Sequence, residues 1–310
     1  MTKTAFVFPG QGSQTVGMLS GLAEVYSSVQ KTFAIASDVL GYDLWQLTQQ
    51  GPTERLDQTE FTQPALLTAS YAVWQVYLQQ PMAKQPSYLA GHSLGEYTAW
   101  VCSGALKFTD AVTLVAKRGQ AMQAAVPQGV GVMAAIIGLE DDVVAAICKE
   151  AQGSQVCSPA NYNSIGQVVI AGHKDAVERA IVMAKDKGAK LAKLIPVSVP
   201  SHCALMKKAA EELAPLLSAI DFDKPVIPVV NNVDANLPST AADIRLGLER
   251  QLTRPVKWVE TIQFFIKAGV THIVECGPGK VLTGLNKRID SQLTLTAYSD
   301  PASLADVLIY

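Results

Sequence analysis

The chain has 310 residues, of which 49% are hydrophobic and 17% are charged, so it can bury a large core and does not belong to the disordered class. Its formal net charge of −2 argues against a nucleic-acid binder that works through bulk positive charge. No apolar run approaches the roughly 20 residues that span a bilayer, and the apolar run before Pro9 is too short for a signal peptide, so we expect a cytoplasmic protein.

Strand-like and helical patterns alternate over the first 127 residues. Runs rich in β-branched and aromatic residues predict a strand at 4–8, which leads into a glycine loop, and another at 88–90. Apolar residues at helical spacing predict helices at about 16–40, at 64–79, from near Glu96, and at 108–125. This alternation is typical of an α/β domain.

The segment from about residue 130 to 194 has its own order of elements. The predicted elements are a strand at 132–137, a helix at 140–151, strands at 155–161 and 167–171 around a turn at 163–166, a helix at 174–187 and a strand at 190–194. The order β-α-β-β-α-β is that of a ferredoxin-like unit. We therefore expect residues 128–196 to form a small subdomain, inserted into a larger α/β domain made of residues 1–127 and 197–310.

The rest of the chain returns to the α/β pattern. It contains a loop at 196–201, a helix from His202 to about 220, a strand at 226–231, helices at 241–252 and 256–267, and a strand at 272–276 that ends at a glycine loop. Strands that alternate with helices indicate a mostly parallel sheet covered on both faces.

Gly91, Ser93 and Gly95 form a G-x-S-x-G pattern between the predicted strand and the helix near Glu96. In a nucleophile elbow, such a serine lies on a sharp strand-to-helix turn, and the flanking glycines allow backbones to approach closely. The start of the following helix offers free N–H groups. A short pattern of this kind often arises by chance, so by itself it is weak evidence. Its place between a predicted strand and a predicted helix favours a nucleophile over an ordinary turn serine.

A serine hydroxyl needs a neighbouring base to become a good nucleophile. His202 is the best candidate, because it follows a loop at the start of a helix, where its side chain can face a cleft. We expect His173, at a turn, and His272, at the start of a strand, to be structural, and His92 to point away from the hydroxyl. No histidine spacing resembles a metal motif, and the five scattered cysteines predict reduced, buried thiols.

Taken together, several motifs of the chain resemble the malonyl-CoA:acyl-carrier-protein transacylase family of bacterial fatty-acid synthesis. The resemblance covers essentially the whole chain. It rests on Gly10-Gln11-Gly12-Ser13-Gln14, Gly91-His92-Ser93-Leu94-Gly95-Glu96, Arg118, Asn161-x-Asn163-Ser164, Gln167-Val168-Val169-Ile170-Ala171-Gly172, Val199-Pro200-Ser201-His202 and Gly277-Pro278-Gly279. It implies a hydrolase-like parallel-sheet core with an inserted ferredoxin-like small subdomain.

The resemblance also implies a role for each residue of the reaction centre. Ser93 is expected to form a malonyl ester, and His202 to act as general base and then as general acid. The backbone carbonyl of Gln251 is expected to orient the histidine where a hydrolase would use a carboxylate. The backbone N–H groups of Gln11 and Leu94 are expected to form the oxyanion hole.

Three further residues are expected to contact the acyl group. Arg118 matches the residue that pairs with the malonyl carboxylate, for which a planar guanidinium is well suited. From its helix alone, in Ala116-Lys117-Arg118-Gly119, it would be a solvated arginine. Met122 lies one helical turn further on and is expected to line the same pocket, although by spacing alone such a residue is more often part of the core. Asn163 is expected to help shape the acyl site.

The implied substrate is malonyl-CoA and the implied partner is acyl carrier protein, with no bound cofactor, metal, nucleic acid or membrane. Two other classes of protein stay open: a serine hydrolase of the esterase or thioesterase class, and a noncatalytic carrier-binding or scaffold protein. Acyl carrier proteins are generally acidic, so a basic rim near the cleft would steer their approach. Its candidate residues could also be ordinary solvated cations: Lys190, Lys193, Lys280, Lys287 and Arg288.

Overall fold

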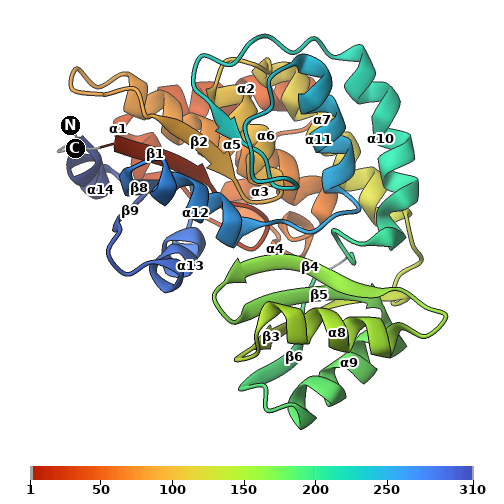
Figure 1. Cartoon of the computed structure of the whole chain (residues 1–310). Coiled ribbons are helices and arrows are strands. Elements are labelled where there is room, and N and C mark those ends of the chain that lie inside the picture. The colour runs from red at the N-terminus through yellow and green to blue at the C-terminus, as the bar shows by residue number, and fades with distance from the viewer. Residues whose placement is uncertain (1–2, 198, 309–310) are drawn as a thin grey trace.

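The computed structural model describes residues 3–197 and 199–308, so residue 198 of the loop predicted at 196–201 lies outside it. A five-stranded parallel sheet with the order β7-β2-β1-β8-β9 forms the larger part of the molecule (Figure 1). Its strands are β1 (Lys3–Phe8), β2 (Tyr88–Gly91), β7 (Val229–Val230), β8 (Val270–Cys276) and β9 (Thr294–Tyr298). The expected parallel-sheet core is therefore confirmed.

The side chains of the central strand β1 pack alternately into two hydrophobic cores, one on each face of the sheet. Because successive side chains of a strand point to opposite faces, Phe6 packs with Trp74 of α5 (Thr59–Leu78) on one face, with ring centroids 5.4 Å apart. Val7 lies in the other core, together with Trp258 of α12 (Trp258–Lys267). Helices thus cover both faces, and the ends of the parallel strands stay free to carry the site.

The helices of this larger part fall into three runs along the chain. Before the small sheet come α1 (Ser20–Val25), α2 (Ser28–Leu40), α3 (Leu44–Gln50), α4 (Thr53–Leu56), α5 (Thr59–Leu78), α6 (Leu94–Cys102) and α7 (Phe108–Ala124). After it come the short η1 (Ala204–Met206), α10 (Lys207–Ala219), α11 (Ala241–Gln251) and α12 (Trp258–Lys267). The chain ends with α13 (Val281–Ile289) and α14 (Pro301–Leu308). No helix within 3–197 or 199–308 is long and apolar enough to cross a bilayer.

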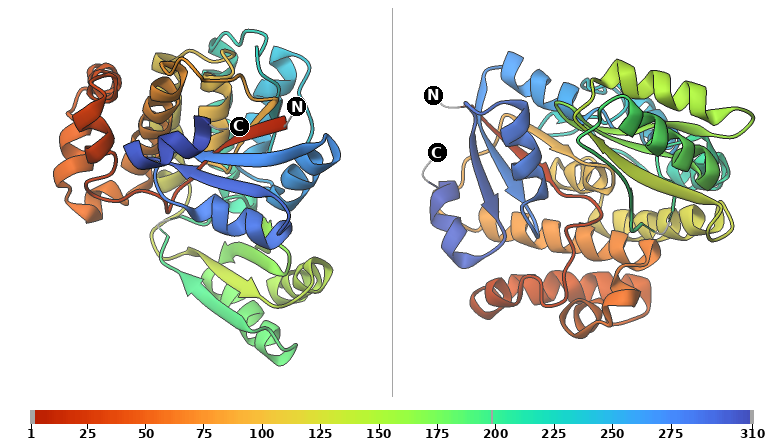
Figure 2. Two further views of the ribbon diagram at one scale, coloured as in Figure 1. Left: turned by 90° about the vertical axis from the view of Figure 1, so that its left-hand side faces the viewer. Right: turned by 90° about the horizontal axis from the view of Figure 1, so that it is seen from below.

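A second, four-stranded antiparallel sheet has the order β4-β5-β3-β6. It consists of β3 (Gly131–Ile137), β4 (Cys157–Ser164), β5 (Gln167–His173) and β6 (Leu191–Ile195), with α8 (Asp141–Gln152) and α9 (Lys174–Asp186) packed against it. The views in Figure 2 show this sheet and its helices as a separate body against one side of the larger one. The small antiparallel subdomain is confirmed, and we propose to keep its boundaries at 128 and 196, just outside β3 and β6.

Several predicted elements differ from those observed. The helix predicted at 16–40 begins only at Ser20, after the left-handed Leu19, and is divided into α1 and α2 at Tyr26, which is extended. The strand predicted at 226–231 shrinks to Val229–Val230, since Pro225 and Pro228 offer no N–H to a ladder.

Other differences lie in the segment after α2, near the turn of the small sheet and at the end of the chain. Asn163 ends up in β4 rather than in the predicted turn. The elements α3, α4, α13, β9 and α14 were not predicted from the sequence.

Candidate active site

Ser93 lies on a sharp turn between β2 and α6, with φ 51° and ψ −108°, a backbone conformation that costs energy for any residue with a Cβ. The glycines on either side make the turn possible. A Cβ on Gly91 would lie 1.9 Å from the backbone of Gly95, and one on Gly95 would lie 2.0 Å from the carbonyl oxygen of Phe8. The sequence pattern thus forms the predicted elbow, with the serine held in a strained conformation by close backbone packing.

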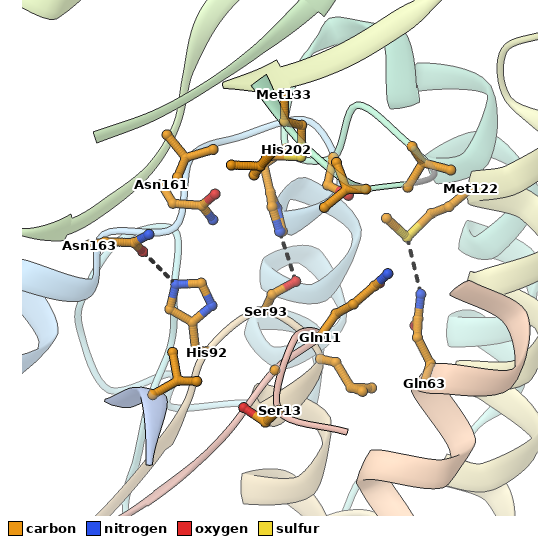
Figure 3. A pocket seen from close by; sticks show the side chains of 18 of the residues that line it. Gln11, Ser13, Gln63, His92, Ser93, Met122, Met133, Asn161, Asn163 and His202 are labelled. Atoms are coloured by element: carbon orange, nitrogen blue, oxygen red, sulfur yellow. Dashed lines mark hydrogen bonds between the residues drawn. The ribbon is translucent and has the colours of Figure 1, made fainter. Parts of the chain in front are cut away.

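The structure brings Ser93 and His202 together although 109 positions separate them in the chain. Oγ of Ser93 lies 2.8 Å from Nε2 of His202, as the dashed line in Figure 3 shows. Nδ1 of the same ring lies 2.7 Å from the backbone carbonyl oxygen of Gln251, the last residue of α11. A carbonyl can only accept, so Nδ1 carries the proton and Nε2 is free to accept one from the hydroxyl.

His202 is almost fully buried, at 3% exposure. Burial lowers the pKa of His202 to about 3, and the nearby Arg118 guanidinium lowers it further, against the opposing effect of the hydrogen bond to Gln251. The imidazole is therefore neutral near pH 7. A neutral ring with its Nε2 lone pair on the serine can act as a general base.

Arg118, in the middle of α7, is 1% exposed and reaches the same hydroxyl. Nη2 lies 3.3 Å from Oγ of Ser93 and donates to Oε1 of Gln251 at 2.9 Å, while Nη1 donates to Oε1 of Gln63 at 2.8 Å. Its Nε has no hydrogen-bond partner among the described residues, and the guanidinium lies over the ring of Tyr97, 5.3 Å from its centroid. A buried guanidinium held only by neutral groups, beside a cleft, can receive an anion.

Of the two residues expected to supply oxyanion donors, Leu94 directly follows the serine and Gln11 lines the same cavity. Leu94 is the first residue of α6, where N–H groups have no acceptor within the helix. The N–H of Ser93 itself is used, because it donates to Oδ1 of Asn232 at 2.8 Å. Gln11 lies in the loop after β1 and lines the cavity, and its side chain contacts Thr59.

A cavity of about 180 Å³ lies where the two sheets meet, in front of Ser93 and His202. Met122 lines it, and its sulfur accepts a hydrogen bond from Gln63 at 3.4 Å. The small sheet supplies the opposite wall (Figure 3). Its lining residues are Met133, Asn161, Asn163, Val169 and Ile195.

Backbone hydrogen bonds hold that wall in place. The N–H of Tyr162 in β4 donates to the carbonyl of Val256 at 2.9 Å, and the N–H of Val256 donates to the carbonyl of Ala160 at 2.9 Å. One strand of the small sheet is thus paired with the segment that leads into α12. Oδ1 of Asn163 lies 2.8 Å from Nε2 of His92, the residue before the serine.

Three polar residues to which the sequence motifs give no role also lie in this site: Glu96, Asn232 and Gln63. Glu96 is 1% exposed, and its Oε2 accepts from Nε2 of Gln251 at 2.8 Å and from the backbone N–H of Asn232 at 3.1 Å. Nδ2 of Asn232 donates to the carbonyl of Gly91 at 2.7 Å. Gln63 holds Arg118. Only Glu96 carried a signal, as an acidic residue on the helix directly after the elbow.

The remaining predicted residues lie where a structural or solvated role is expected. Nε2 of His272 lies 2.9 Å from Oγ1 of Thr296, and Nδ1 of His173 accepts from the N–H of Val156 at 2.9 Å. All five cysteines are free and buried. The candidate basic rim residues are all exposed: Lys190, Lys193, Lys280, Lys287 and Arg288.

The architecture and the sequence together define the class of the protein. The family model described as acyl transferase domain matches residues 5–292 of the chain. The chain therefore belongs to the acyl transferase family.

The closely similar proteins narrow the class. The malonyl CoA-acyl carrier protein transacylase of Salmonella typhimurium is 58% identical over 308 residues, which cover 99% of both chains. The crystal structure of an acyl carrier protein S-malonyltransferase from Vibrio cholerae has a TM-score of 0.97 at 57% identity and covers 99% of this chain and 100% of that one. A structure of a type II PKS acyl-carrier protein in complex with its malonyl-transacylase has a TM-score of 0.98 at 54% identity, covering 99% of each chain. Within its family the chain thus groups with the malonyl CoA-acyl carrier protein transacylases.

Proposed function

We propose that the protein transfers a malonyl group from malonyl-CoA to the phosphopantetheine thiol of acyl carrier protein, in fatty-acid biosynthesis, through an ester on Ser93. The observation that carries the proposal is the convergence on one hydroxyl: Oγ of Ser93 lies 2.8 Å from Nε2 of His202 and 3.3 Å from Nη2 of Arg118. A base and a carboxylate-binding cation therefore serve the same nucleophile. The names of the similar proteins supply the two substrates.

In the first half-reaction, Oγ of Ser93 attacks the thioester carbon while Nε2 of His202 takes the hydroxyl proton. The carbonyl oxygen becomes an oxyanion, which the N–H groups of Gln11 and Leu94 stabilise. One such donor is typically worth about 3–4 kcal/mol of the barrier. The C–S bond then breaks, and the histidine returns its proton to the departing coenzyme A thiolate.

The second half-reaction uses the same groups in the reverse direction. His202 takes the proton of the phosphopantetheine thiol, the thiolate attacks the malonyl ester, and Oγ of Ser93 leaves with that proton. Gln251 holds the ring through both steps, because its carbonyl accepts from Nδ1.

Arg118 supplies the selectivity for an acid-tipped acyl group in this scheme. Its guanidinium can pair with the free malonyl carboxylate in a buried site, where an acetyl group offers no partner. Met122 and Asn163 line the same cavity and shape the space for the acyl chain.

A serine hydrolase is the less favoured reading of the same elbow. In a Ser-His-Asp hydrolase a carboxylate orients the histidine, whereas a backbone carbonyl takes that place beside His202. The predicted cytoplasmic location and the expected absence of a bound cofactor stay predictions.

Intact-mass measurement after incubation with malonyl-CoA tests the proposal. We expect a single malonyl adduct on the native chain, its removal by holo acyl carrier protein, and no adduct on Ser93→Ala. An undiminished adduct on Ser93→Ala, or hydrolysis without transfer to the carrier, would count against it.

A further inference from the structure

The side-chain amide of Gln251 stands between two buried groups of opposite charge. Its Oε1 accepts a hydrogen bond from Nη2 of Arg118 at 2.9 Å, and its Nε2 donates to Oε2 of Glu96 at 2.8 Å. Arg118 and Glu96 are each only 1% exposed. The amide dipole is therefore aligned with both charges, and it links them without direct contact between the guanidinium and the carboxylate.

Glu96 is the only described anion placed to offset Arg118. Buried carboxylates in the described ranges are Glu96 and Glu275, and Glu275 accepts the N–H groups of Leu282 and Thr283 at the start of α13. Arg118 takes part in none of the ion pairs among the described residues. An uncompensated buried charge is costly, so the pair Glu96 and Arg118 keeps this site close to neutral.

We propose that Glu96 is a positioning residue that takes up a proton when a malonyl carboxylate pairs with Arg118; the inference rests on the proposed function. With the malonyl carboxylate bound, two carboxylates, that of malonyl and that of Glu96, surround the single positive charge of Arg118 in a buried site, so the site carries one excess negative charge. A proton from solvent that binds a carboxylate oxygen of Glu96 removes this excess negative charge. No bond to the substrate forms or breaks in this step, and the protonated carboxyl still accepts from Gln251 through its other lone pairs.

Glu96 is poised for such a change. Burial raises the pKa of Glu96 to about 7, against the opposing effects of its hydrogen bonds and of Arg118. The other titratable groups of the cluster do not change charge near neutral pH: burial raises the pKa of Tyr97 to about 12, lowers that of His202 to about 3, and lowers that of His92. Arg118 stays protonated.

A competition between malonyl-CoA and acetyl-CoA for Ser93, followed between about pH 6 and 9, separates the titration of Glu96 from that of the other groups. Both donors share coenzyme A, Ser93 and His202, so the titrations of these groups cancel in the early ratio of malonyl to acetyl ester. For the native chain we expect the ratio to fall above about pH 7, with a limit of about tenfold per pH unit. Glu96→Gln keeps the size and the acceptor but cannot titrate, so its ratio should not change with pH.

Glu24→Gln, at an exposed position of α1, is the matched control and should keep the native slope. A native ratio that does not change with pH, or equal slopes for the native chain and Glu96→Gln, would overturn the inference. If no malonyl ester forms on Ser93 at any pH, the proposed function fails instead.

A second measurement leaves Glu96 intact, in case Glu96→Gln does not fold. Ser93→Ala is titrated calorimetrically with malonyl-CoA and with acetyl-CoA near pH 7.5, in two buffers that differ in ionisation enthalpy. We expect more protons to be taken up when malonyl-CoA binds than when acetyl-CoA binds. Equal proton uptake for the two donors would contradict the role of Glu96.

Discussion

Nδ1 of His202 donates to the backbone carbonyl of Gln251 across 2.7 Å, at the end of α11. The last carbonyls of a helix lack partners within it and carry partial negative charge, so they favour a cation nearby. The end of a helix thus orients the imidazole and stabilises its protonated form, as a carboxylate does in a serine hydrolase. It does so without a full negative charge, which would repel an acid-tipped acyl group.

The buried His202 should make stability depend on pH. In the unfolded chain its pKa is near 6.5, whereas in the folded chain burial and Arg118 lower it to about 3. Between these values the unfolded state binds more protons at this site, so the folded state loses stability as pH falls from about 6.5 towards 3. We expect urea unfolding to show this loss in the native chain, relative to His202→Asn, with a limiting slope of about 1.4 kcal/mol per pH unit.

Burial also lowers the pKa of His272, to about 4, but both chains carry that residue, so its effect cancels in the comparison. Parallel stability curves for the native chain and His202→Asn would show that His202 is not held neutral by the fold.

Gly95 should tolerate no side chain. A Cβ there would lie 2.0 Å from the carbonyl oxygen of Phe8, and both backbones are fixed by the elbow. We expect Gly95→Ala to lower the free energy of unfolding by about 3 kcal/mol or more, or to prevent folding, as measured by urea denaturation.

Gly284 is the matched control, since it lies within α13 and a Cβ there would meet no atom within 4 Å. Gly284→Ala should stabilise the chain by about 0.5–1 kcal/mol, because alanine loses less backbone entropy in a helix. Similar effects of the two substitutions would contradict the packing argument.

The sequence predicted the elements with strong local patterns and the residues with a motif. The alternation in the small sheet predicted β-α-β-β-α-β, and the glycines around Ser93 predicted the elbow. Both signals arise from backbone requirements that only certain residues meet. The place of His202 between a loop and a helix makes it the best candidate base for Ser93, and the resemblance supports the same pair. Spacing adds nothing to this prediction, because contacts between distant residues leave no periodic trace in one sequence.

The burial and the hydrogen-bond partners of the charged residues could not be predicted from the sequence. Arg118 on its helix resembled a solvated arginine, and only the packing of α7 against α5 and α6 shows it to be buried. Glu96 lies in the first turn of the helix after the elbow, where an acidic residue is favourable because of the helix dipole. Its place in the sequence by itself therefore indicates no further role for this carboxylate. Its contact with Gln251 depends on α11, 155 positions away.

Arg118 should be required for malonyl but not for acetyl loading. Arg118→Ala leaves a malonyl carboxylate unpaired in a buried site, so we expect a loss of about 3–5 kcal/mol of transition-state stabilisation for malonyl loading. This loss lowers kcat/KM for malonyl-CoA by at least about a hundredfold. Acetyl loading should change much less. Arg118→Lys should recover little, because one ammonium cannot replace the fork whose Nη1 and Nη2 contact separate partners.

Rates of Ser93 ester formation, followed by mass with each donor, measure this selectivity. Lys117→Ala, at the exposed neighbouring position, is the control and should leave both rates near native. An equal loss for malonyl and acetyl would remove Arg118 from its assigned role.

The hydrogen bond between Asn163 and His92 should couple the small sheet to the elbow. The two side chains lie 2.8 Å apart and join β4 to the residue before Ser93. We expect Asn163→Ala to lower the free energy of unfolding by about 1 kcal/mol and to raise KM for malonyl-CoA more than it lowers kcat, because the contact between Ser93 and His202 stays intact. In a double-mutant cycle with His92→Ala, the two losses should be less than additive by a similar energy, and strictly additive losses would show that the contact does not couple the two parts.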